Sequence, residues 1–184
     1  DNEDNNQIPD QAVVLLDEAI RNALIIEERF YETDYLDDAY YILGRSSYLI
    51  DRITASNYYF NRLITEFPNS DLFNETLVWI GYINLKIGNI DEAKNTISLI
   101  PEVSNKEKYL LYILSSEIAK HEDNSIEIIE NYKFALDYAD KDQKIYIYKK
   151  LLNYSEDNQK FDNCIDYLTK IEKLVGNENF LGII

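Results

Sequence analysis

Residues 40–68 read YYILGRSSYLIDRITASNYYFNRLITEFP, and the spacing of side chains in this stretch decides the fold. Two small residues, Gly44 and Ser56, stand twelve positions apart. An aromatic residue lies four positions outside each of them, Tyr40 before Gly44 and Phe60 after Ser56. Residues four apart share one face of an α-helix. The pattern therefore predicts two helices joined by a tight turn, with the small residues where the helices approach closely.

The same arrangement recurs three more times, at intervals of 35 to 37 residues. The later pairs of positions twelve apart are Gly81 and Ala93, Ser116 and Ile128, and Leu152 and Cys164. A single helix pair cannot cover its own apolar stripe, so it stacks on a neighbouring pair. The period predicts an all-α array of helix pairs, and the lack of sustained period-two alternation argues against β-strands.

Eight positions of the first unit carry a characteristic series of aromatic, small and apolar residues: Tyr40, Leu43, Gly44, Ser47, Ser56, Phe60, Leu63 and Pro68. With this spacing the unit resembles the tetratricopeptide repeat family. The second unit keeps the turn at 88–93, whereas Ser116 and Leu152 replace the glycine in the third and fourth units. The resemblance covers 37–175. It implies a right-handed superhelical solenoid of about four helix pairs with an extra N-terminal helix.

Polar breaks and composition suggest the boundaries along the chain. The first six residues are Asp, Asn and Glu alone, Pro9 suits a helix start, and Gly176 suits a helix end. We expect a flexible acidic leader at 1–8, an N-terminal helix at 9–33, a solenoid at 34–176 and a C-terminal tail at 177–184. The four expected units lie near 37–70, 74–105, 109–140 and 145–176. The apolar tail either caps the last hydrophobic face, docks onto a partner or is the edge of a longer array.

Charge and composition exclude several functional classes. The 184 residues include 34 acidic and 18 basic ones, for a net charge of −16. Binding to nucleic acid or to anionic lipid requires Lys and Arg, so neither is expected. No apolar run approaches the roughly 18 residues of a membrane span. A single cysteine makes neither an internal disulfide nor a multi-cysteine zinc site.

No constellation of catalytic residues is visible in the sequence. The five glycines are dispersed, so they form neither a dinucleotide-binding nor a phosphate-binding loop. The one histidine, His121, lies in a polar turn without a nucleophile fixed beside it. The acidic segments lack the ligand spacing of a calcium loop. We therefore predict that the protein is not an enzyme and has no catalytic residues, cofactor or metal site.

The first helix of each pair lines the inner surface in the resembled family, and it supplies the candidate binding residues. This groove is expected to contain Tyr41, Arg45, Tyr48, Val78, Tyr82, Lys86, Ile113, Glu117, Lys120, Lys149 and Asn153. Aromatic residues beside cations suit peptide recognition. Two alternatives remain open. These residues merely cover the groove, or Lys149 and Asn153 belong to a clamp for a C-terminal carboxylate.

The function that follows is a non-enzymatic adaptor that binds one or more partner proteins through the groove or an edge. The alternative is an exported structural subunit of a membrane-associated assembly. The sequence contains no Met, so we expect it to begin within a longer reading frame, after processing or as a fragment. The joint at 67–70, Phe-Pro-Asn-Ser, resembles bacterial envelope repeat proteins such as the lipoprotein of outer-membrane barrel assembly and the periplasmic Tol-associated coordinator. This resemblance favours the periplasm or outer-membrane periphery over the cytoplasm, and it allows for a lipid anchor upstream of residue 1.

Overall fold

The computed structural model describes residues 8–100 and 104–176. These residues form nine α-helices and no strand, so the predicted all-α fold is confirmed. Contacts between the helices divide the chain into unit 1 (Asp1–Pro101) and unit 2 (Glu102–Ile184). The predicted tail at 177–184 lies outside the described residues, as does the predicted leader at 1–8 apart from Ile8.

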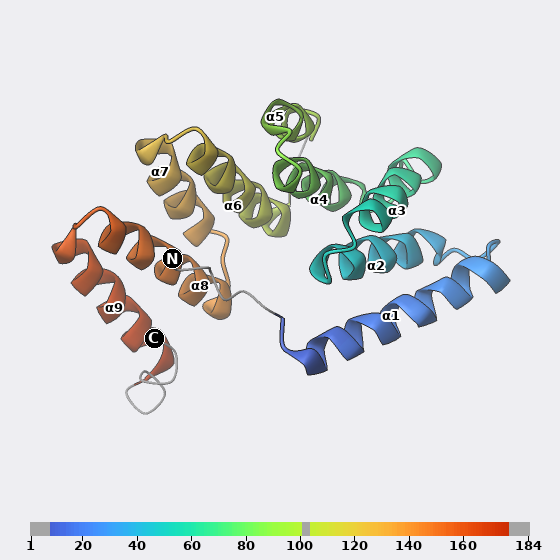
Figure 1. The fold of residues 1–184 in the computed structure, drawn as a ribbon, viewed down its shortest axis with the longest axis horizontal. Coiled ribbons are helices and arrows are strands. Elements are labelled where there is room, and N and C mark those ends of the chain that lie inside the picture. The colour runs from blue at the N-terminus through green and yellow to red at the C-terminus, as the bar shows by residue number, and fades with distance from the viewer. Residues whose placement is uncertain (1–7, 101–103, 177–184) are drawn as a thin grey trace. The chain divides into compact units, whose positions relative to one another are not determined.

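Unit 1 is built from five helices that pack in chain order (Figure 1). They are α1 (Asp10–Arg29), α2 (Leu36–Leu49), α3 (Ile53–Glu66), α4 (Phe73–Lys86) and α5 (Ile90–Ser98). Each helix contacts the next, and α2 also contacts α4. The pairs α2–α3 and α4–α5 are the helix pairs of the first two repeats, and α1 packs along α2.

Unit 2 contains the third and fourth helix pairs. The helices are α6 (Asn105–His121), α7 (Ser125–Leu136), α8 (Lys141–Asp157) and α9 (Phe161–Val175). The first helix of each pair begins with a capping box, from Ser104 and Glu107 at α6 and from Asp140 and Gln143 at α8. These side chains satisfy N–H groups that a helix start leaves without intrahelical partners.

The turn inside each helix pair has the same geometry in all four repeats. The residue seven positions after the first small residue has a positive φ: Asp51 (64°), Gly88 (84°), Asp123 (53°) and Gln159 (56°). The next N–H group donates to the carbonyl five residues back, as from Arg52 to Ser47 at 2.8 Å and from Lys160 to Ser155 at 2.8 Å. This is the Schellman motif, which closes the end of a helix on itself. The four turns therefore stand at the same position of each repeat, including the third and fourth repeats, whose sequence pattern is degenerate.

The small residues lie where the two helices of a pair approach closely, as their spacing predicts. The Gly44 backbone lies directly against the ring of Phe60, which is fully buried. In unit 2 the Ser116 hydroxyl donates to the Ile128 carbonyl at 3.3 Å, across the same seam between paired helices. Cys164 is buried at the matching place in the last pair, as a core thiol. Close approach at these points lets large neighbours fill the seams.

Candidate partner-binding surface

The eleven predicted groove residues lie on the first helix of each pair. Six belong to unit 1, on α2 (Tyr41, Arg45, Tyr48) and α4 (Val78, Tyr82, Lys86). Five belong to unit 2, on α6 (Ile113, Glu117, Lys120) and α8 (Lys149, Asn153). Each set belongs to its own compact unit.

In unit 1 the structure brings α2 and α4 together around Trp79. Its ring lies 5.3 Å from that of Tyr48 and 5.6 Å from that of Tyr82, measured between centroids. All three residues are half-buried, and Tyr48 and Trp79 pack against the core of unit 1. We call Tyr48, Trp79 and Tyr82 the aromatic cluster. Aromatic pairs at such distances hold one another in place and keep a rigid apolar surface at low entropic cost.

Two exposed cations border the aromatic cluster. The Arg45 guanidinium lies 5.7 Å from the centre of the Trp79 ring, and the Lys86 ammonium lies 5.3 Å from that of Tyr48. Lys86 also forms an ion pair of 2.7 Å with Asp51 in the α2–α3 turn. Among the described residues Arg45 forms no ion pair, so its charge is available to a partner. The surface therefore combines flat aromatic area with positive charge in a strongly acidic chain.

A buried hydrogen-bond chain supports the cluster from beneath. The Tyr41 hydroxyl donates to the Glu75 carboxylate, and the Trp79 indole N–H donates to the Tyr41 oxygen at 3.1 Å. Tyr41 is 8% exposed and Glu75 is 5% exposed. Burial, followed by the bond to Glu75, raises the pKa of Tyr41 above its usual value. These two hydrogen bonds fix the orientation of the Trp79 ring and join α2 to α4.

Three of the predicted residues are buried in the structure. Val78 is 1% exposed and Ile113 is 5% exposed, and Tyr41 belongs to the buried chain just described. These side chains pack inside their units. The other eight predicted residues are half-buried or exposed.

In unit 2 the predicted residues form a smaller, polar arrangement. The Glu117 carboxylate accepts from the Lys120 ammonium at 2.9 Å and from the Tyr132 hydroxyl at 2.8 Å. Lys120 also lies 5.4 Å from the centre of the Tyr132 ring. On α8, Lys149 is half-buried and Asn153 is exposed, four residues apart on one side of the helix.

Sequence reasoning missed Trp79 and Glu75. Both stand at helical spacing from predicted residues, since 75, 79, 82 and 86 follow one another at intervals of three and four. Trp79 is also the one tryptophan of the chain. This stripe was the available signal for both residues.

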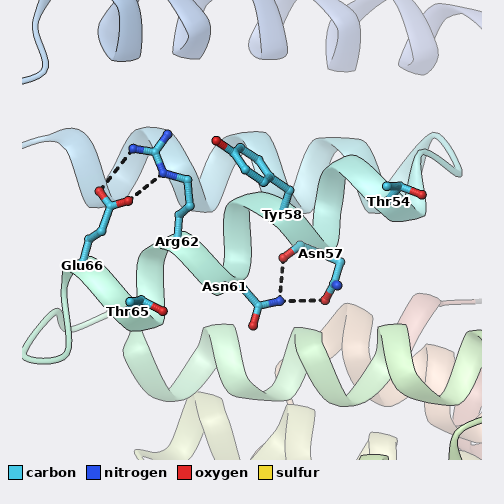
Figure 2. A pocket seen from close by; sticks show the side chains of 7 residues that line it. All are labelled: Thr54, Asn57, Tyr58, Asn61, Arg62, Thr65 and Glu66. Atoms are coloured by element: carbon cyan, nitrogen blue, oxygen red, sulfur yellow. Dashed lines mark hydrogen bonds and ion pairs between the residues drawn. The ribbon is translucent and has the colours of Figure 1, made fainter.

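A hollow also lies along α3, lined by residues between Thr54 and Glu66. Figure 2 shows the Asn61 amide directed at Asn57 and the Arg62 guanidinium bridging to Glu66. Arg62 also pairs with Glu27 of α1. Since these polar groups satisfy one another, we place the candidate site at the α2–α4 surface instead.

Within residues 8–100 and 104–176, no three or more His, Cys, Asp or Glu side chains are grouped so that they would hold a metal ion. None of the helices in these same residues is both long and apolar enough to span a lipid bilayer.

Residues 38–70 match the sequence model of the tetratricopeptide repeat family. The matched segment covers most of α2, all of α3 and the turn after it. This is the first repeat, in which the pattern of residues is best preserved. No curated protein is significantly similar in sequence to the chain.

Proposed function

We propose that the protein is a non-enzymatic interaction scaffold that holds a segment of a partner protein against α2 and α4 of unit 1. Tetratricopeptide repeats typically mediate binding between proteins and are generally not enzymes, and 38–70 match that family. The observation that carries the proposal is the half-exposed aromatic cluster, held from below by Tyr41 and Glu75 and bordered by Arg45 and Lys86.

The chemistry of this surface suits an extended or helical peptide. Tyr, Trp and Arg are the residues that most often dominate binding energy at protein interfaces. Their orientation here is fixed before binding, so little side-chain entropy remains to be lost. In unit 2 we propose that Glu117, Lys120, Lys149 and Asn153 make additional polar contacts.

The test is to isolate the partner and ask whether it depends on the aromatic cluster. The chain with Tyr48→Ala and Tyr82→Ala is compared with wild type and with a control variant, Tyr58→Ala, at an exposed position of α3. Tyr58 is 55% exposed, so its removal should leave the fold intact. We expect one partner to be recovered with wild type and control and to be at least about tenfold depleted with the double variant.

Trp79 then provides a direct readout with the purified partner. As the one tryptophan, it reports binding through a change in its fluorescence. Equal recovery of every protein from all three baits, with no change in Trp79 emission, would contradict the proposal. Circular dichroism of each variant shows whether its helices are retained.

As a second candidate we propose an exported structural subunit of a bacterial envelope assembly. The Phe-Pro-Asn-Ser joint is a well-formed turn, because the Ser70 hydroxyl donates to Asp37 at 2.6 Å and accepts from the Leu72 N–H at 3.1 Å. What favours this candidate is the sequence of the joint, which resembles that of envelope repeat proteins. Fractionation of the native cells should place the protein with periplasm or outer membrane, and recovery in the cytosol would refute this candidate.

A further inference from the structure

The corner between α1 and α2 exposes three large aromatic side chains within six residues. Phe30 is 59% exposed, Tyr31 is 66% exposed and Tyr35 is 67% exposed. We call these three residues the aromatic corner. Single exposed apolar residues are ordinary on a protein surface, whereas a contiguous group marks an interaction site.

Backbone hydrogen bonds hold the aromatic corner in place. The Phe30 N–H donates to the Ile26 carbonyl at 2.9 Å, which is the last helical hydrogen bond of α1. The Thr33 N–H donates to the Phe30 carbonyl at 3.0 Å, and the Tyr35 N–H donates to the Thr33 hydroxyl at 3.4 Å. A small hollow lies here, lined by Arg29, Phe30, Tyr31, Glu32 and Thr33. The aromatic groups therefore sit on an ordered turn, and a partner side chain has a depression to enter.

Carboxylates surround the aromatic corner. Residues 27–38 contain six acidic side chains and one basic one, Arg29. Glu28, Glu32, Asp34 and Asp38 are exposed, and no described Lys or Arg forms an ion pair with them. Partial burial and the neighbouring charge of Asp37 raise the pKa of Asp38. Six carboxylates thus face one basic residue within the segment, Arg29, and one ion pair from outside it, between Arg62 and Glu27, so the net charge here is negative.

We propose that the aromatic corner docks a Lys- and Arg-rich segment of a partner protein. The aliphatic stem of a Lys or Arg packs on Phe30 and Tyr31 while its charged end meets Glu32. The aromatic faces add cation–π attraction to these ion pairs. A second copy of this chain, with a net charge of −16, and an anionic lipid surface are both repelled by the same field.

This surface is separate from the aromatic cluster. Tyr35 precedes α2 and Tyr48 lies near its end, so the two positions are about 20 Å apart along the helix. The proposal therefore does not rest on binding at the α2–α4 surface, and either one can fail alone.

The experiment uses a fluorescein-labelled peptide of Lys and Arg with Gly and Ser spacers, titrated with the full chain by anisotropy. One variant removes the aromatic corner (Phe30→Ser, Tyr31→Ser, Tyr35→Ser). A second removes nearby charge (Glu28→Gln, Glu32→Gln, Asp34→Asn). A control removes equal charge from exposed positions on α5, α7 and α8 (Asp91→Asn, Glu130→Gln, Glu156→Gln). Titrations are run at low and at physiological salt, since salt weakens exposed charge pairs. Circular dichroism checks each fold, and the hydrogen exchange of wild type is compared with and without peptide.

We expect both corner variants to bind the peptide at least about tenfold more weakly at low salt and the control to stay within about twofold of wild type. The peptide should slow hydrogen exchange at 29–38. Equal weakening by the control, or wild-type affinity of the aromatic variant, would show diffuse charge attraction and overturn the proposal. Binding to vesicles of phosphatidylcholine, with or without phosphatidylglycerol, in the absence of peptide binding would also overturn it.

Discussion

A Cβ atom on Gly44 would lie 2.5 Å from Cε1 of Phe60. Real side chains do not tolerate such a distance, so either the ring or the helix must move. Phe60 has no room to move, because it is fully buried between α2, α3 and the Trp79 ring, whose centroid is 6.4 Å away. The glycine is therefore required by the approach of two helices.

Gly44→Ala should destabilise the protein. Replacing a helical glycine by alanine ordinarily stabilises by about 0.5–1 kcal/mol. Here overpacking against Phe60 costs about 1–3 kcal/mol and outweighs that gain. Urea denaturation gives the free energy of unfolding. Phe60→Leu in the same chain should recover part of the loss, and a more stable Gly44→Ala protein would contradict this account of the seam.

Gln159→Gly should stabilise the last helix pair. Its φ of 56° lies in the left-handed region, which costs most residues about 1–2 kcal/mol and glycine little. We expect a net gain of about 0.5–1 kcal/mol after the entropy of the unfolded glycine is included. Thermal unfolding measures it. Glu156→Gly, three residues earlier in α8, is the control and should be destabilising by about 1 kcal/mol.

Tyr41→Phe should weaken the contact between α2 and α4. It removes a hydrogen bond to the buried Glu75 carboxylate and the acceptor of the Trp79 indole. Losing a bond to a charged group costs about 1.5–3 kcal/mol. Denaturation followed by Trp79 emission measures both stability and local environment. Tyr31→Phe, on an exposed ring, should change neither, and equal stability of the two variants would exclude the proposed role of Tyr41.

Stability should fall in alkali. Burial raises the pKa of Tyr40 and of Tyr109 to about 12, against about 10 in an unfolded chain. The unfolded state therefore loses these protons first. The stabilisation is complete below about pH 10 and is lost as pH rises towards about 12. Urea denaturation across this range, with tyrosinate absorbance, tests it. Tyr109→Phe should flatten the decline, and an unchanged slope would contradict the assignment.

The helix pairs followed from the sequence because two small residues twelve apart fix both helices and the turn between them. Which of the groove residues are exposed did not follow from the spacing, and the reason is the angle between positions around the helix axis. An α-helix advances about 100° per residue, so the position three before the small residue lies only about 60° from the seam. Four predicted residues occupy it: Tyr41, Val78 and Ile113 are buried, and Lys149 is half-buried. The position one after it lies about 100° away, where Arg45 is exposed and Tyr82 is half-exposed.

The contacts of Trp79 show what the spacing of residues within one helix cannot predict. It stands two before Gly81, about 160° from the seam, and is half-buried. Its partners Tyr48 and Arg45 belong to another helix. Such contacts depend on how α2 and α4 pack, which no spacing within either helix contains.

The four equivalent turns have a consequence for how the chain folds. Each is closed by hydrogen bonds between residues three and five apart, as from Asp51 to Tyr48 and from Arg52 to Ser47. A helical hairpin whose turn is closed by residues close in sequence can nucleate folding in any repeat. Contacts between residues this close in sequence also favour rapid folding. Damage to one turn should accordingly loosen its own stretch of the chain first, so that the protein comes apart in stages instead of all at once.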